Sequence, residues 1–313
     1  MNDIVLHHYA GSPFSEKVRL VLGMKKLRWR SVDVPVVMPK PDVVALTGGY
    51  RRTPFMQIGA DVYCDSALMC RVIDRIAPEP PLYPEASRGL HDIVAQWADS
   101  ALFWTAVPFT LQPAGLPHIL GDAGPDTLRA FAADRAAMNP LMRRAPLSDQ
   151  AAYLRAYAER LDNLLADSRP FLLGPLPSIA HFAAAQSIWF IRRAPPVAAH
   201  LEPYARLLAW YARVAAFGHG NAVAMSSGEA IALARGTTTF AACAVEPVAG
   251  LVEGATVGVV PSDYAFDEVV GRLVGLDDNE VVVERSDDRA GTVRVHFPRI
   301  GFHVKVVDRK EAS

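Results

Sequence analysis

The segment 9–19 constrains the fold of this 313-residue chain most, because it joins an apolar strand-like run, residues 4–6, directly to a helical pattern. Ser12 is a preferred N-cap residue, Pro13 suits the first helical position, and Glu16 lies in the first turn, where the helix dipole favours acidic groups. A hydroxyl group is therefore expected at the start of a helix that follows a strand. Helix capping alone is one role for this hydroxyl, and contact with a ligand is the other.

Three regions of different composition follow one another along the chain. Residues 1–80 alternate strand-like and helix-like runs in the order β-α-β and then β-β-α, which is typical of a thioredoxin-like α/β domain. Residues 86–235 are rich in Ala and Leu at helical spacing and predict an all-helical domain, with a buried central helix over 179–191 and a short last helix over 229–235. Residues 240–313 carry five short Val-rich runs between turns, which predict a small all-β barrel or roll.

The composition excludes several classes of protein. The 32 basic and 33 acidic residues leave no basic field for nucleic acid or for an anionic membrane. No apolar run reaches membrane-spanning length, and no signal sequence is recognisable. The three cysteines form neither a CxxC pair nor metal-ligand spacing, and no histidine has a partner at such spacing, so we expect no metal site. These features predict a cytoplasmic protein.

Two further segments of residues 1–80 place polar groups at the ends of strands. Pro54 interrupts the entry to a strand after Arg52 and Thr53. A cis Thr53–Pro54 bond would turn the Thr53 backbone toward a ligand, whereas trans is the general expectation for a proline. Asp65 and Ser66 follow the next hairpin strand and supply a carboxylate and a hydroxyl beside the free N–H groups of a helix N-terminus.

With these motifs, the chain resembles the glutathione S-transferase superfamily over residues 1–80 and 86–235. Ser12-Pro13-Phe14 resembles the serine-type motif of its tau-like and zeta-like classes. Thr53-Pro54 matches the position of a cis-proline in that family, and Asp65-Ser66 matches an acidic-Ser pair. The resemblance does not extend to residues 240–313, an extra C-terminal β module.

The resemblance implies a binding site for glutathione as the co-substrate. The cysteinyl backbone of glutathione would pair with Thr53 beside Pro54, and its γ-glutamyl group would lie on Asp65 and Ser66. Arg52 stands where a basic residue often meets the glycyl carboxylate.

The catalytic group implied by the resemblance is Ser12, with Tyr9 as its rival. A thiol is a poor nucleophile, so the enzyme must hold glutathione as a thiolate. The Ser12 hydroxyl can donate a hydrogen bond to the sulfur, and the helix N-terminus adds a favourable field. Some classes use a tyrosine near the end of the first strand, which is close to the position of Tyr9.

The electrophile pocket is expected between the first two domains, a usual place for ligand sites. Phe14, Trp104 and Phe109 are candidate apolar walls of this pocket, and ordinary core packing is the alternative for the two helical aromatics. One departure from the family is His181, which stands where an acidic residue usually completes a capping box with the residue corresponding to Ser178.

Three functions are compatible with the sequence. The first is a cytoplasmic glutathione transferase that conjugates small electrophiles, a homodimer by resemblance. The second is a glutathione-binding or interaction protein that keeps the fold without turnover, which the additional β region favours. The third is a glutathione-dependent isomerase, because the zeta-like classes include such enzymes. No nucleic-acid or membrane partner is expected in any of them.

Overall fold

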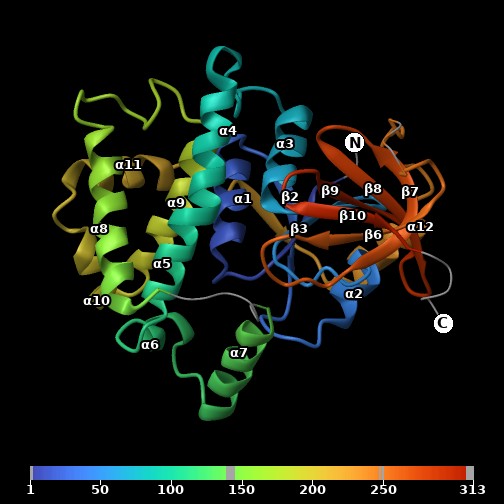
Figure 1. Cartoon of the computed structure of the whole chain (residues 1–313), viewed down its shortest axis with the longest axis horizontal. Coiled ribbons are helices and arrows are strands. Elements are labelled where there is room, and N and C mark those ends of the chain that lie inside the picture. The colour runs from blue at the N-terminus through green and yellow to red at the C-terminus, as the bar shows by residue number, and fades with distance from the viewer. Residues whose placement is uncertain (1–2, 139–144, 247, 249, 308–313) are drawn as a thin grey trace.

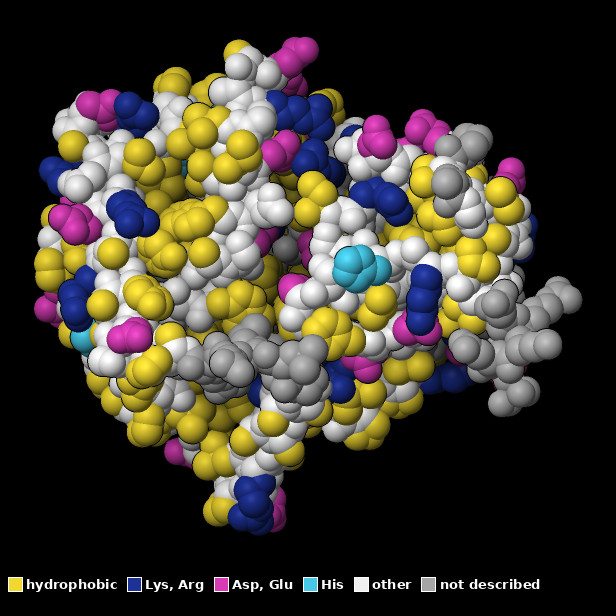
Figure 2. All heavy atoms as spheres, viewed as in Figure 1, with side chains coloured by type: hydrophobic (Ala, Val, Ile, Leu, Met, Phe, Trp, Pro, Cys, Tyr) yellow, Lys and Arg dark blue, Asp and Glu magenta, His cyan; other side chains and the backbone are white. Residues whose placement is uncertain are grey.

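The computed structural model describes residues 3–138, 145–246, 248 and 250–307. These residues form two lobes, with most helices in one lobe and the strands together with helix α2 in the other (Figure 1). Helices α1 and α3 lie between the two lobes. A hollow that contains acidic side chains runs between the lobes, and apolar side chains gather on the surface of the helical lobe (Figure 2).

The N-terminal part has the thioredoxin-like order that the sequence predicts. Its central sheet has the order β4-β3-β1-β2, in which β1 pairs parallel with β2, and β3 pairs antiparallel with both β1 and β4. The elements are β1 (Val5–His8), α1 (Pro13–Met24), β2 (Arg28–Asp33), α2 (Pro41–Thr47), β3 (Phe55–Ile58), β4 (Asp61–Cys64) and α3 (Ser66–Ile76).

The middle region is helical, as predicted, and is organised around α9 (Ile179–Arg192). This helix is apolar on nearly all faces and packs against α1, α4, α5 and α11. His181 replaces the usual acidic residue of the capping box, because its Nδ1 accepts the Ser178 backbone N–H at 2.8 Å. The other helices of the region are α4 (Arg88–Trp97), α5 (Phe103–Thr110), α6 (Leu116–Leu120), α7 (Pro125–Met138), α8 (Leu147–Asn163), α10 (Pro195–Ala198) and α11 (Ala205–Ala215).

The C-terminal region is rich in strands, as predicted, and its strands continue the N-terminal sheet. Neighbouring strands pair antiparallel in the order β10-β6-β7-β8-β9, and β9 then pairs parallel with β4. At the opposite edge, β5 (Asn221–Ala224) pairs parallel with β2. The result is one ten-stranded sheet in which neither β2 nor β4 is left as an exposed edge. The strands are β6 (Thr256–Pro261), β7 (Val269–Leu276), β8 (Glu280–Asp287), β9 (Gly291–Pro298) and β10 (Phe302–Val306).

Alternation along the strands separates the two large clusters of the apolar core, and Val5, Val32 and Ala230 form a third, small cluster. Met56 and Tyr63 belong to the cluster that includes α1, α3 and the helical lobe. Their neighbours Phe55, Val62 and Cys64 belong to the cluster that includes α2 and the C-terminal strands. Because successive residues of a strand point to opposite faces, the thioredoxin-like sheet forms a layer shared by both clusters. Helix α12 (Ser227–Gly236) packs against α2, β2 and β9.

No helix within the described ranges is both long enough and apolar enough to cross a membrane.

Candidate functional site

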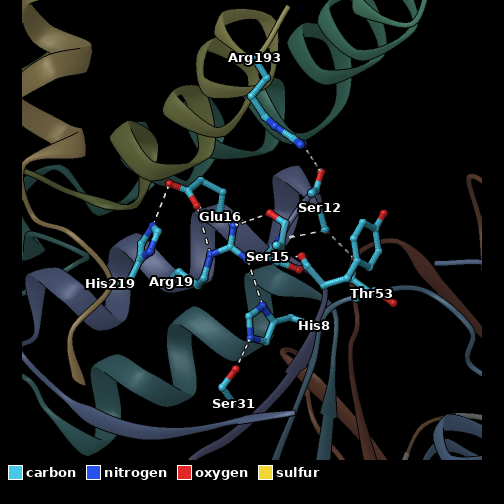
Figure 3. Close-up of polar contacts among 12 residues, drawn as sticks. His8, Ser12, Ser15, Glu16, Arg19, Ser31, Thr53, Arg193 and His219 are labelled. Carbon is cyan, nitrogen blue, oxygen red and sulfur yellow. Dashed lines mark hydrogen bonds and ion pairs between the residues drawn. The ribbon is translucent and has the colours of Figure 1, made fainter. Parts of the chain in front are cut away.

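Ser12 caps helix α1 and meets Thr53 at the entry to β3 (Figure 3). Its Oγ accepts the Ser15 backbone N–H at 3.2 Å and lies 3.5 Å from the Thr53 carbonyl oxygen, to which it donates. Ser12 is 2% exposed. The rival hydroxyl of Tyr9 belongs to a partly buried side chain that packs against the core cluster of the C-terminal strands. The structure thus joins Ser12 to Thr53, and the choice between Ser12 and Tyr9 stays a prediction.

Two arginines hold the loop that leads to the cap of α1. Arg19 donates from Nη1 to the Tyr9 carbonyl at 3.4 Å and from Nη2 to the Ala10 carbonyl at 3.1 Å. Arg193, from the end of α9, donates to the Gly11 carbonyl at 3.2 Å. All three loop carbonyls are therefore bound by guanidinium groups. Neither arginine can be recognised from the sequence as a positioning residue, because their partners are backbone atoms that leave no sequence pattern.

A network of side chains fixes Arg19 in turn (Figure 3). Arg19 donates to Glu16 at 2.7 Å, and Glu16 also lies 3.0 Å from the His219 Nε2. Burial alone would raise the pKa of Glu16, but the hydrogen bond from His219 and the charge of Arg19 lower it, so the carboxylate is charged. Burial, and then the charge of Arg19, lowers the pKa of His8 to about 4. The neutral ring can accept from Arg19 at 3.0 Å through Nδ1 and donate to Ser31 at 2.8 Å through Nε2.

Asp65 and Ser66 lie at the start of α3, as expected. Asp65 is the N-cap and its Oδ1 accepts the Ala67 backbone N–H at 2.8 Å. Its backbone has φ 75° and ψ 132°, a conformation that residues other than glycine rarely adopt. Such outliers concentrate at functional sites, where the surrounding structure enforces them.

A buried ion pair orients the Ser66 hydroxyl. Lys17 donates to the Ser66 Oγ at 3.2 Å and to the Asp99 Oδ2 at 2.5 Å, and Gln186 donates to the Asp99 Oδ1 at 2.6 Å. Burial would lower the pKa of Lys17, but the charge of Asp99 raises it, so the ammonium group stays charged. Because the Ser66 oxygen accepts from Lys17, its hydrogen is available for an acceptor on a ligand.

Arg52 contacts two residues of the C-terminal region, and its assignment to the glycyl carboxylate stays a prediction. The Thr53–Pro54 bond is cis, as the resemblance implies. The Arg52 side chain, however, pairs with the Asp263 carboxylate at 2.5 Å and donates to the Tyr264 carbonyl. Its guanidinium lies 3.7 Å from the centre of the Tyr264 ring. The cation assigned to a ligand carboxylate is thus bound by a carboxylate of its own chain, from the loop between β6 and β7.

Lys40 is a second cation beside Thr53, and it was not among the predicted site residues. Its Nζ donates to the Arg51 carbonyl at 3.2 Å and to the Thr53 Oγ1 at 3.4 Å. Burial, followed by the charge of Arg135, lowers the pKa of Lys40 to about 8. Because Lys40 lies in the Pro-rich loop before α2, periodicity gave no signal for it.

The candidate pocket aromatics separate into two groups. The Phe14 ring lies 4.5 Å from that of Phe103, which lies 5.0 Å from that of Trp104. Trp104 in turn meets the Tyr264 ring at 5.2 Å. Phe14 and Trp104 thus belong to one aromatic row at the boundary of the two lobes. Phe109 is buried in the helical core, where its ring meets His200 at 5.2 Å.

Neither of two further pockets is lined by Ser12, Thr53 or Asp65. One is lined by residues that include Tyr63, Cys243 and His296, and the other by residues that include His7, Lys40, Asp42 and Ser227. Within the part of the chain that the structure describes, no three His, Cys, Asp or Glu side chains gather closely enough to hold a metal ion.

The comparisons with known proteins agree with the geometry. The family described as "Glutathione S-transferase, N-terminal domain" matches residues 6–81. A GST-like protein from Pseudomonas syringae is 36% identical, with 98% of this chain and 100% of that chain covered and a TM-score of 0.82. A search of curated proteins finds no match.

More distant structures share the fold over a smaller part of the chain. A glutathione S-transferase from Rhodospirillum rubrum F11 is 20% identical and covers 68% of this chain and 87% of its own, with a TM-score of 0.52. The β-etherase LigF from Sphingobium sp. strain SYK-6 is 16% identical and covers 68% and 95%, with a TM-score of 0.52. The Pseudomonas syringae protein is thus similar over nearly the whole chain, and the other two over about two thirds of it.

Proposed function

Because the chain belongs to the glutathione S-transferase superfamily, we propose that it binds glutathione and conjugates the thiolate to a small electrophile. One observation supports the proposal most: the Ser12 Oγ lies 3.5 Å from the Thr53 carbonyl oxygen. A hydroxyl at a helix N-terminus and the backbone beside a cis-proline are the two groups that the resemblance assigns to the cysteinyl part of glutathione. They come from segments 41 residues apart in the sequence.

The proposed chemistry requires Ser12 to exchange one acceptor for another. In the structure its hydroxyl hydrogen is directed to the Thr53 carbonyl, while the Ser15 N–H occupies the oxygen. On binding, the hydroxyl rotates and donates to the glutathione sulfur. A hydrogen bond to a charged group is worth about 1.5–3 kcal/mol, and the helix N-terminus adds about 0.3–1 kcal/mol. The thiol proton leaves to solvent, and the sulfur electron pair forms the bond to the electrophilic carbon. With an aryl chloride as the electrophile, the carbon–chlorine bond then breaks and chloride leaves with its electron pair.

The remaining groups bind the two substrates. We assign the γ-glutamyl group to Asp65 and Ser66, where the Ser66 hydrogen can be donated, and the cysteinyl backbone to Thr53. The aromatic row that contains Phe14 and Trp104 would face the electrophile. The active form would be cytoplasmic, as the composition predicts, and a homodimer, as the resemblance implies.

Substitution of the two rival hydroxyls tests the proposal. Ser12→Ala should lower kcat/KM for conjugation of an activated aryl chloride by about ten- to a hundredfold, the equivalent of one charge-assisted hydrogen bond. Tyr9→Phe should leave kcat/KM within about twofold. The control is Ser226→Ala, which removes a similar helix cap, that of α12, from a position outside the site. If Tyr9→Phe abolishes conjugation and Ser12→Ala does not, the catalytic assignment is wrong.

A glutathione-binding protein without turnover is the second candidate. The additional C-terminal strands favour it, because they extend the N-terminal sheet through the pairing of β9 with β4, and an added region of this kind often serves a partner or a structural role. Retention on immobilised glutathione, together with no conjugation across a panel of electrophiles, would support this candidate over the transferase.

A further inference from the structure

The loop between β6 and β7, residues 262–268, reaches from the C-terminal strands to the proposed glutathione site. Asp263 and Tyr264 of this loop both contact Arg52. The guanidinium lies 3.7 Å from the centre of the Tyr264 ring, within the range of a cation–π contact. Arg52 therefore receives a carboxylate, a carbonyl and an aromatic face from two successive residues of one loop.

The same loop also contacts two helices of the helical lobe, α7 and α5. The Ala265 backbone N–H donates to the Met138 carbonyl, at the end of α7, at 2.7 Å. The Tyr264 ring meets Trp104 of α5. Burial raises the pKa of Tyr264 to about 12, although the neighbouring charge of Arg52 opposes this increase. The loop thus bridges the two lobes beside groups that the proposed function assigns to glutathione.

Burial makes the pair between Arg52 and Asp263 asymmetric. Arg52 is 6% exposed, so its charge needs an anionic partner within the protein. The Asp263 side chain is 51% exposed and can return to water at little cost. The Arg52 Nε–H is buried and has no acceptor among the residues described. An incoming carboxylate could replace Asp263 on this guanidinium without leaving the cation unpaired.

We propose that Asp263 is a specificity-determining residue, because its carboxylate occupies the guanidinium that would otherwise bind the glycyl carboxylate of glutathione. This inference rests on the proposed function. In the native chain a ligand gains little from a carboxylate at this end of the site, because that carboxylate must displace Asp263. The native protein therefore accepts thiol peptides whether or not this end carries a negative charge.

The test compares glutathione with its glycyl monoethyl ester, which keeps the peptide and thiol but lacks the terminal charge. Their dissociation constants are measured by calorimetry on the wild type, on Asp263→Ala and on Asp267→Ala. In the wild type the two ligands should bind within about twofold of each other. Asp263→Ala should bind glutathione about tenfold more tightly and leave the ester unchanged, since only the free acid can use the vacated Arg52; tenfold corresponds to about 1.4 kcal/mol.

Asp267→Ala is the matched control. It removes the same charge from the same loop, but Asp267 faces Arg51 at 4.0 Å rather than Arg52. In the Asp267→Ala variant, the ratio of the dissociation constants of glutathione and its ester should equal that of the wild type. The inference is overturned if glutathione binds the wild type and Asp263→Ala equally well, while the proposed function stands. If none of the three proteins binds either ligand, the proposed function fails and this inference with it.

Discussion

Replacement of His296 tests the connection between the C-terminal strands and the thioredoxin-like sheet. His296 of β9 lies between Asp61 of β4, at 2.8 Å from Nε2, and Glu280 of β8, at 2.5 Å from Nδ1. The ring is 2% exposed. Because carboxylates only accept hydrogen bonds, both ring nitrogens must carry hydrogen, and the ring is an imidazolium cation. One cation therefore ties together three strands of the continuous sheet.

The expected magnitude follows from these contacts. Each hydrogen bond to a charged group is worth about 1.5–3 kcal/mol, and loss of one partner of a buried ion pair costs about 3–5 kcal/mol. Gln in place of His296 keeps a donor but no charge. The carboxylates keep weaker partners, since Asp61 also accepts the Ala241 backbone N–H at 2.8 Å and Glu280 lies 3.7 Å from Arg75. We expect His296→Gln to lower the free energy of unfolding by about 3 kcal/mol.

Urea unfolding at pH 6 measures this loss, with His303→Gln as the control because His303 is exposed on β10 of the same region. A pH series adds a second signature. Burial lowers the pKa of His296, but its bonds to Asp61 and Glu280 outweigh burial and raise it above 6.5. The stabilisation is then complete below pH 6.5 and is lost as pH rises through the folded-state pKa. His296→Gln should lack this alkaline decline. Unfolding free energies within about 0.5 kcal/mol of the wild type, or the same decline in the variant, would refute the reasoning.

Two further predictions concern stability. Burial lowers the pKa values of His7, His8 and His181 to about 4, so between pH 6.5 and 4 the unfolded state binds protons that the folded state does not. As the pH is lowered from 6.5 to 4, the free energy of unfolding should decrease by about 1.4 kcal/mol per pH unit for each histidine. Urea midpoints that stay constant over this range would contradict the prediction. Gly23→Ala should cost about 3 kcal/mol, because the added Cβ would lie 2.0 Å from the Gly218 carbonyl oxygen. Gly89→Ala, where the added Cβ meets nothing within 4 Å, is its control and should be neutral or slightly stabilising in urea unfolding.

Local patterns predicted much of the fold and part of the site. The cap at Ser12, the buried helix over 179–191 and the five C-terminal strands each depend on neighbours in the sequence, and the structure confirms them. The capping box of α9 was a partial exception. His181 has no acidic group, yet its neutral ring nitrogen accepts the same backbone N–H that a carboxylate would.

Contacts between distant segments were not predictable in the same way. The parallel pairing of β9 with β4 joins Asp61 to Arg294, and no turn or spacing in the sequence sets such a register. The partner of Arg52 depends on that pairing, since Asp263 comes from a loop 211 residues away. A basic residue at the expected position identifies a cation but not the carboxylate that binds it.

The sheet fixes the position of Asp263. In the proposed competition for Arg52, this position determines how strongly Asp263 opposes a ligand carboxylate. The antiparallel pairing of β6 with β7 holds the two ends of the loop 262–268 together. The last residue of this loop, Glu268, lies close to the turn after α2, because a Cβ added to Gly49 would be 3.3 Å from the Glu268 carbonyl oxygen. A carboxylate tethered in this way has an effective concentration at its partner of about millimolar or more. A free ligand carboxylate must exceed that concentration, unless contacts at Ser12 and Thr53 supply the difference. If the proposed function holds, the C-terminal strands would therefore affect ligand binding at the site as well as complete the fold.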